Sequence, residues 1–273
     1  MSPRHFASRV AFAGFASLIG VFFALPMLWL VFAPFNGKPT LAAKPSSPTL
    51  GNFRQVFERD DVFPALRNSA LLVAGTVLIV VLVGAPASYA LSRIRFPGRD
   101  LFLYLLLLLS SVITGTAAIV PLFYLIFQLN LSDTFQGVCL ALAGGMLPAA
   151  IFILKDFVDS MPKSYEESAR VFGASSFQIL KDIVAPVVRP GLAVIAVWTI
   201  VNVWGNFLIP FILLRNPDRA PAAVVIYNFY TEFGQPDLRL LSAFALIYSV
   251  PVVVMYLFVN VRYGFRFHGG IKR

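Results

Sequence analysis

The sequence has little charge, one cysteine and two histidines. Asp, Glu, Lys and Arg together make up 13% of its 273 residues, whereas soluble domains average about 25%. Apolar residues make up 58% of the chain, and its mean hydropathy is +0.79. A soluble globule of this length could not bury so much apolar surface, but a lipid bilayer covers it. The composition therefore predicts an integral membrane protein and excludes a soluble enzyme, a secreted disulfide scaffold and a disordered chain.

The scarcity of Cys and His also limits the chemistry that the chain can perform. Cys139 has no partner for an internal disulfide, and its place in an apolar run predicts a small buried side chain. His5 and His268 lie near opposite ends of the chain, and neither G-x-x-x-x-G-K-[ST] nor G-x-G-x-x-G occurs. The sequence thus predicts no catalytic residue, no metal site and no cofactor bound by this chain. Any energy for its function must come from a partner.

Six long and almost uncharged runs are the main positive feature of the sequence. Each is long enough to cross a hydrocarbon core of about 30 Å as a helix rising about 1.5 Å per residue. Charged residues lie at or beyond their ends, as the high free energy of charge in lipid requires. An all-α protein with six transmembrane helices in one domain, residues 1–273, is therefore predicted. The approximate spans are 10–35, 68–91, 101–127, 134–154, 187–214 and 240–261.

Basic residues cluster between these runs, and their distribution predicts the orientation. Fourteen of the 22 Lys and Arg residues lie at the two termini, after the second run, and between the fourth and fifth runs; eight lie in the opposite loops. Cytoplasmic loops carry the excess of basic residues. Both termini of a multi-pass inner-membrane protein are therefore expected to be cytoplasmic. The same distribution explains the net charge of +9 without a nucleic-acid partner.

Residues 159–186, between the fourth and fifth runs, carry the signals of an amphipathic helix. Asp159 followed by Pro162 predicts a helix start, with a capping side chain and a proline in the first turn. Opposite charges then recur four residues apart, a spacing that stabilises helices. These predicted pairs are Lys163 with Glu167 and Glu166 with Arg170.

A bend and a second short helix are predicted next. Gly173 can adopt the positive φ of a residue that follows a helix end. Ser175 and Gln178 have the spacing of a capping box, and Pro186 ends the second helix. Amphipathicity alone is also typical of a helix pair that lies flat on a membrane surface.

The spacing within this segment carries more information than its amphipathicity. Its fixed positions are Glu167-Ser168-Ala169, then Gly173 after three intervening residues, Ile183 after nine more, and Ala185-Pro186 after one more. This series resembles the EAA loop of ABC importer permeases, whose pattern is E-A-A-x3-G-x9-I-x-L-P. Ser168 and Ala185 depart from the pattern, and both are small. Phe172 stands where sugar-importer relatives often have Asp.

The resemblance covers nearly the whole chain and is closest to carbohydrate-uptake permeases. The glycine-containing tail is similar to that of the second permease subunit of maltose-type importers. The segments that carry the resemblance are Asn68-Ser69, Tyr89 to Arg93, Phe96-Pro97-Gly98, Pro121-Leu122, Met161-Pro162-Lys163, Gly264, and His268 to Arg273.

The resemblance implies a type I ABC importer permease fold with a cytoplasmic coupling helix. It also implies a related second permease subunit, two cytoplasmic ATPase subunits that bind ATP and Mg²⁺, and an extracytoplasmic solute-binding protein. Movement of the ATPases would push the EAA helix, and the two permeases would open alternately to each side. In the family, the residue that matches Glu167 meets a basic residue of the ATPase, so Glu167, Ser168, Ala169, Gly173, Ile183 and Pro186 are the expected ATPase-coupling residues.

Polar residues within the spans are the candidates for the solute pathway, because such side chains face the bundle interior or a wet cavity. Thr199, Asn202 and Asn206 are three and four residues apart, which places them on one helical face. Hydrogen bonding between helices explains them equally well. Ser111 and Thr114 form a weaker set, for which helix packing is the simpler explanation.

Two other classes of protein remain as alternatives. An ion-coupled secondary transporter usually has intramembrane carboxylate, His or Arg residues or broken helices around an ion site. A membrane-embedded enzyme would need a cluster of reactive side chains, which the runs lack. Within the importer class, sugars, amino sugars and glycerol-3-phosphate-type esters are all possible solutes; the lack of basic residues deep in the spans favours a neutral sugar.

Overall fold

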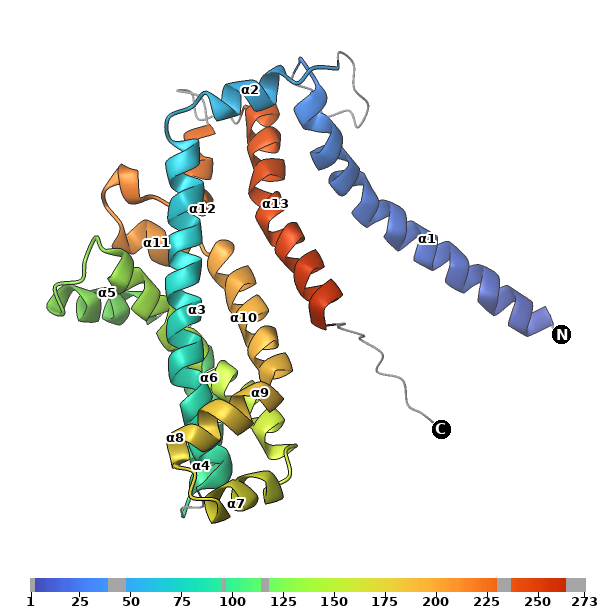
Figure 1. The fold of residues 1–273 in the computed structure, drawn as a ribbon. Helices are drawn as coiled ribbons and strands as arrows, with labels where there is room; N and C mark the ends of the chain where they lie inside the picture. Colours follow the sequence, from blue (N-terminus) through green and yellow to red (C-terminus); the bar gives the residue numbers. More distant parts are fainter. Residues whose placement is uncertain (1–2, 39–47, 95–96, 114–117, 230–236, 264–273) are drawn as a thin grey trace. The chain divides into compact units, whose positions relative to one another are not determined.

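The computed structural model describes residues 3–38, 48–94, 97–113, 118–229 and 237–263, and these ranges are helical apart from their connections (Figure 1). The all-α prediction is confirmed. The longer helices are α1 (Pro3–Phe32), α3 (Val62–Arg93), α4 (Arg99–Ile113), α5 (Ile119–Gln128), α6 (Phe135–Asp159), α10 (Arg189–Trp204) and α13 (Leu238–Tyr263). The shorter helices are α2 (Gly51–Phe57), α7 (Ser164–Val171), α8 (Ser176–Gln178), α9 (Ala185–Val187), α11 (Leu208–Leu213) and α12 (Ala222–Val225).

Four described helices, α1, α3, α6 and α13, are long and apolar enough to cross a membrane. They correspond to the first, second, fourth and sixth predicted spans. The segment from α8 to α9, residues 176–187, is bent by 76° relative to α10. If this segment and α10 count as one span, they make a fifth crossing. The third predicted span, 101–127, is covered by α4 and α5, and residues 114–117 between them lie outside the described ranges. The count of six spans stays a prediction.

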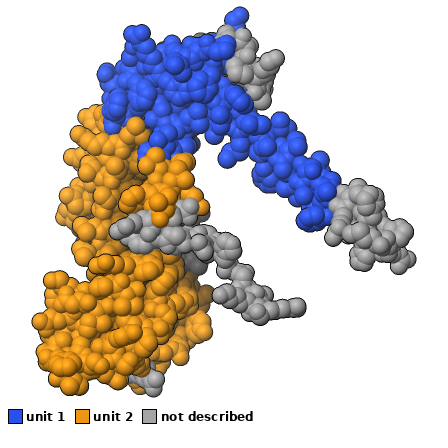
Figure 2. Space-filling view, turned by 45° about the vertical axis from the view of Figure 1, so that its right-hand side comes forward, with its two compact units in different colours: residues 1–63, 225–251 blue, residues 64–224, 252–273 orange. Residues whose placement is uncertain are grey.

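The chain forms two compact units, which are coloured separately in Figure 2. The smaller unit contains residues 1–63 and 225–251, and the larger contains residues 64–224 and 252–273. In the smaller unit, the Asn52 side chain donates hydrogen bonds to the carbonyls of Pro34 (2.7 Å) and Asn36 (2.8 Å), which fixes α2 to the end of α1. The Arg59 guanidinium lies 4.7 Å from the centre of the Phe229 ring.

Helix α6 is the centre of the larger unit, where α4, α5, α10 and α11 all contact it. Its buried Leu154 packs in one apolar cluster with Val80 of α3 and Ile195 of α10. Helices α3 and α6 approach closely, because a Cβ on Gly75 would lie only 2.8 Å from the Cys139 Sγ. Cys139 is a free, buried thiol among the described residues, as predicted.

Polar side chains near the start of α3 hold the loop that follows α11. The Asn68 side chain donates hydrogen bonds to the carbonyls of Asp218 (2.8 Å) and Ala220 (3.2 Å). The Ser69 hydroxyl accepts a hydrogen bond from the N–H of Ala222 at 2.9 Å. The loop is thereby tied to a helix about 150 residues earlier in the sequence.

The same loop is held from a second side by Asp133, which precedes α6. Its Oδ1 accepts hydrogen bonds from the N–H groups of Arg215 (2.9 Å) and Asn216 (3.1 Å). Its backbone carbonyl accepts a hydrogen bond from Arg219. The N–H groups of Asn216 and Arg215 lower the pKa of the Asp133 carboxyl, because they stabilise its charged form.

Candidate functional site

Helix α7 is shorter at its start than the sequence predicted. Asp159 is the last residue of α6, and α7 begins at Ser164. The predicted helix start at residues 159–162 is therefore wrong. A proline drives the preceding residue out of the helical conformation, so Pro162 marks the break between two helices and does not lie in the first turn of the second.

Glu166, in the first turn of α7, forms a buried ion pair with Arg93 at the end of α3. The Arg93 Nε lies 2.6 Å from the Glu166 Oε1, and the two side chains are 10% and 5% exposed. The Tyr89 hydroxyl donates a hydrogen bond to the Glu166 Oε2 at 2.8 Å. The predicted pair of Glu166 with Arg170 is therefore wrong, because a cation 73 residues away occupies the carboxylate.

Arg93 also joins α7 and α3 to the end of α6. Its Nη2 donates hydrogen bonds to the carbonyls of Val158 (3.0 Å) and Met161 (3.2 Å). The last carbonyls of a helix lack intrahelical donors and carry partial negative charge, so a guanidinium there is favourable. Ser92 donates a second hydrogen bond across the same junction, to the Asp159 carboxylate. Three helix ends thus meet at one buried arginine.

The turn after α7 is fixed by backbone hydrogen bonds. Gly173 has φ of +83°, and its N–H donates to the carbonyl of Arg170 at 2.9 Å. The N–H of Ala174 donates to the carbonyl of Ala169 at 3.0 Å. These two bonds make a Schellman motif, which requires a residue with positive φ. The prediction that Gly173 adopts a positive φ directly after the helix end is confirmed.

The second half of the loop begins at once with the predicted capping box. The Ser175 Oγ accepts a hydrogen bond from the Gln178 N–H (3.3 Å), and the Gln178 side chain accepts one from the Ser175 N–H (2.8 Å). No residue other than Ala174 separates this cap from the preceding turn. The bend between the two helices is therefore determined on both sides and behaves as a rigid elbow.

After α8, the chain continues as a π-helix, residues 179–184, and then as α9. Ile179 and Val184 are buried and pack with Val158 and Met161. Ile183 is partly buried against the same cluster. Pro186 is exposed in α9, and the 76° bend into α10 follows one residue after α9 ends.

The outer surface of this loop is apolar with a carboxylate beside it. Val171, Phe172 and Phe177 are 83%, 90% and 71% exposed. Glu167 and Ser168 are also exposed, and no described residue forms an ion pair or side-chain hydrogen bond with Glu167. Exposed apolar patches beside polar groups are typical of protein interfaces.

Comparisons with known proteins identify the family of the chain. Residues 8–265 match the family described as binding-protein-dependent transport system inner membrane component. The chain belongs to this family. It is therefore a transport permease of the inner membrane, and the expectation of an ABC importer permease is confirmed.

Individual relatives agree with the family over most of the permease. It is 31% identical to the trehalose transport system permease protein SugB of Mycobacterium tuberculosis, covering 87% of this chain and 88% of that protein. It is 27% identical to the maltodextrin transport system permease protein MdxG of Bacillus subtilis, covering 90% and 89%. A chain of a bacterial ABC transporter involved in alginate import has the same fold, with a TM-score of 0.82, 19% identity, and coverage of 96% and 99%.

The predicted pathway residues of the permease lie in different environments. Thr199 is fully buried in α10, whereas Asn202 is exposed and donates a hydrogen bond to the carbonyl of Trp198 at 2.8 Å. Asn206 lies beyond the end of α10, and its Oδ1 accepts a hydrogen bond from the N–H of Ile209 at 3.1 Å. The expectation that all three share one helical face is wrong, because α10 ends at residue 204.

The weaker pathway set lies at the end of α4 and beyond it. Ser111 belongs to α4, and its side chain lies outside the described residues, as does all of Thr114. A role in the pathway stays a prediction for this set and for Thr199, Asn202 and Asn206. The same holds for the contact of Glu167, Ser168 and Ala169 with an ATPase.

Sequence analysis missed the residues that hold α7 in place. Arg93 and Tyr89 belong to a segment that carried the family resemblance, but no function was assigned to them. Their signal was their position, since Arg93 is the first cation after a long uncharged run. Nothing in the sequence identified Glu166 as its partner.

Proposed function

We propose that the permease is one of two related membrane subunits of a sugar importer, which together form the translocation pathway. The relatives named for trehalose and maltodextrin transport support this solute class, since the similarity extends over nearly nine-tenths of each chain. A neutral sugar is also consistent with spans that have no basic residue at depth. Amino sugars and glycerol-3-phosphate-type esters are the competing solutes.

The solute is tested in the assembled importer. The permease is purified with its second permease and ATPase subunits, and ATP hydrolysis is measured with the solute-binding protein and a panel of solutes. Stimulation by a neutral oligosaccharide supports the proposal. Stimulation by a phosphate ester alone contradicts it.

We infer that α7 transmits motion from the ATPase subunits, which bind ATP and Mg²⁺, to this chain. The observation that carries the inference is the different environment of two neighbouring carboxylates. Glu166 is buried in an ion pair within the chain, and Glu167 is exposed without a partner among the described residues. A carboxylate in the first turn of a helix is stabilised by the helix dipole. Glu167 is therefore placed to accept a cation from another subunit, beside the exposed Phe172.

Glu167→Gln tests this assignment. The exposed charge is expected to contribute to ATPase binding, so the variant should insert normally and recover less ATPase on co-purification, or hydrolyse ATP without solute uptake. Lys163→Gln, a change of one exposed charge one turn earlier, is the matched control. Unchanged co-purification and uptake in Glu167→Gln would show that the carboxylate is only solvated.

The orientation follows from the same proposal, because ATPases act from the cytoplasm. The end of α3 that carries Arg93 would then face the cytoplasm, with both termini. A reporter that is active only in the cytoplasm, fused after Arg273, should be active. Activity only of a periplasmic reporter would contradict the orientation.

A further inference from the structure

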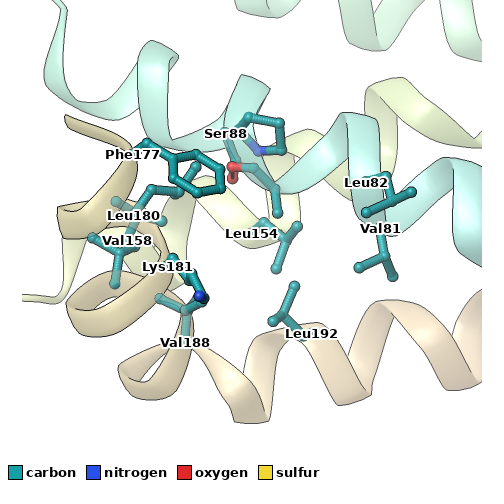
Figure 3. A pocket seen from close by; sticks show the side chains of 14 residues that line it. Val81, Leu82, Ser88, Leu154, Val158, Phe177, Leu180, Lys181, Val188 and Leu192 are labelled. Carbon is teal, nitrogen blue, oxygen red and sulfur yellow. Dashed lines mark hydrogen bonds between the residues drawn. The ribbon is translucent and has the colours of Figure 1, made fainter. Parts of the chain in front are cut away.

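A cavity of the larger unit lies against the half of the loop that follows the elbow. Its volume is about 380 Å³, and it is an open cavity bordered by α3, α6, the segment from α8 to α9, and α10 (Figure 3). Figure 3 shows aliphatic side chains that include Val81 and Leu82 of α3 and Leu192 of α10. Lys181 is the only charged residue among those that line the cavity.

The cavity lies at the depth of lipid acyl chains. Its lining on α3 extends from Val81 to Ser88, which are 12 and 5 residues before Arg93. At 1.5 Å per residue, this places the cavity roughly 8 to 18 Å from the level of Arg93. A hydrocarbon core is about 30 Å thick, so with Arg93 at the membrane surface, as the proposed orientation requires, the cavity lies within the leaflet on the side of α7.

The polar groups of the cavity favour an anionic ligand over a sugar. The Ser88 hydroxyl already donates to the carbonyl of Ala85 at 2.8 Å, so the walls offer few hydrogen-bond partners for a carbohydrate. Lys181 forms no ion pair with any described residue, and the neighbouring Asp182 does not line the cavity. A lysine can lay its apolar stem along such walls and keep its ammonium in the headgroup region.

The wall that carries Lys181 has an unusual backbone. Leu180, Lys181 and Val184 project from the π-helical segment 179–184. Single π-helical turns are rare and occur frequently at functional sites. This is a second observation, independent of the cavity, that marks the same wall.

We propose that the cavity binds one acyl chain of an anionic phospholipid, with the Lys181 ammonium at its phosphate. The occupant is a lipid because the cavity is apolar, lies at acyl-chain depth and has one positive charge. The bound chain would contact the π-helical segment and α10 together. The lipid would thus lie against the part of the loop that follows the elbow.

The test measures lipid binding to the permease purified with its partner subunits. Phosphatidylglycerol and phosphatidylcholine with identical acyl chains are titrated, and bound lipids are counted by native mass spectrometry. Wild type should prefer phosphatidylglycerol. Lys181→Gln should lower this preference about fivefold, the effect of one basic residue at a membrane surface, whereas Lys163→Gln, which changes a lysine outside the cavity, should not.

Two further variants test the cavity itself. Ala85→Phe would fill it and should remove the tightly bound lipid of either kind. Leu82→Trp narrows the cavity from a side chain that is 63% exposed, so it should preserve the fold. It is the test that remains if Ala85→Phe does not assemble. The proposal is overturned if Lys181→Gln keeps the full preference, or if neither cavity variant loses bound lipid.

A protein occupant is the competing explanation. A benzophenone amino acid at position 82, where Leu82 lines the cavity and is exposed outside the loop surface proposed for the ATPase, is irradiated in vesicles that contain phosphatidylglycerol. A lipid adduct on the permease supports the proposal. An adduct with another subunit and none with lipid overturns it, because the cavity is then part of a protein interface.

Discussion

Breaking the ion pair between Arg93 and Glu166 should release α7 from the larger unit. In Arg93→Ala, the Glu166 carboxylate would keep only the Tyr89 hydroxyl, in a site where its side chain is 5% exposed. The change also removes the donors to the carbonyls of Val158 and Met161. Both the docking of α7 and the end of α6 would be affected.

The size of the effect follows from the burial of the pair. An exposed ion pair contributes at most about 1 kcal/mol, but removing one partner of a buried pair costs about 3 to 5 kcal/mol. The lower end applies here, because Lys163 and Arg170 line the same small cavity of about 110 Å³ and can approach the orphaned carboxylate. A loss of about 3 kcal/mol makes opening of α7 roughly 150-fold more frequent.

Hydrogen exchange of the α7 amides, residues 164–171, in the purified complex measures this opening. Arg93→Ala should accelerate exchange roughly 150-fold, and Lys163→Gln, a change of an exposed charge next to the start of α7, should leave it unchanged. Replacing both partners by methionine should restore much of the protection, since a buried pair is often replaceable by apolar side chains. Each single methionine variant completes the double-mutant cycle.

Exchange in α7 within twofold of wild type for Arg93→Ala would refute the reasoning. The apolar contacts of the loop with Met161 and Val158 would then be sufficient to hold α7. A methionine double variant as unprotected as the two singles would also contradict it, because the loss would come from packing and not from an unpaired charge.

The remaining predictions concern backbone strain, pH and the polar residues near the end of α10. Gly173→Ala should destabilise the elbow by about 1 to 2 kcal/mol, because the φ of Gly173 is +83°, although no atom lies within 4 Å of a Cβ there. Gly144→Ala is the control, since a Cβ there also meets nothing within 4 Å. Equal thermal stabilities of the two variants would contradict the strain argument. The pKa of Asp133 is lowered by its N–H donors, so the stability that it contributes should be complete above pH of about 4, the ordinary Asp value, and be lost as pH falls through the lower folded value. Limited proteolysis of the loop at residues 215–220 measures this, and a loss already at pH 6 would be inconsistent with it. Asn206→Ala should lower the free energy of unfolding by about 1 kcal/mol, because the Asn206 side chain caps the first turn of α11. Asn202→Ala should alter uptake without affecting stability. Normal uptake in Asn202→Ala would support a packing role.

Local rules were sufficient for the elbow but not for its attachment. The Schellman turn at Gly173 and the capping box of Ser175 and Gln178 depend on residues within six positions of each other, so their spacing predicted them. Each signal also agreed with the next, since a helix stop was followed at once by a helix start. Such agreement between neighbouring signals makes a short sequence predictive.

The pairing of Glu166 was not predictable from spacing, because two partners were available. Arg170 lies one helical turn away, at the spacing of a surface pair worth about 0.3 to 0.5 kcal/mol. Arg93 lies 73 residues away and is reached only when α3 and α6 end side by side. The buried site favours Arg93 because its guanidinium also satisfies two carbonyls at the end of α6, which Arg170 on α7 does not.

The fifth span shows a different limit. Hydropathy gives the length of an apolar run but not the continuity of the helix within it. The run 187–214 contains α10, a break at residues 205–207, and α11. Asn206 lies in that break, where its side chain is needed for a cap and not for a helical face.

The polar contacts at the two ends of α3 have a mechanical consequence. At one end, Asn68 and the loop after α11 hold α3, and the same loop is held by Asp133 at the start of α6. At the other end, Arg93 joins α3 to the end of α6 and to α7. With Gly75 and Cys139 in close contact between these ends, α3 and α6 behave as one rigid pair. Force applied to α7 would therefore move α3 and α6 together. Through Ile179 and Val184, the same force would also act on the bend that leads into α10. Removing Arg93 would disconnect only the first of these routes. If the ATPase binds at Glu167 and the exposed Val171, Phe172 and Phe177, as we propose, an Arg93→Ala permease should keep this binding and lose the tight ratio of solute transported to ATP hydrolysed.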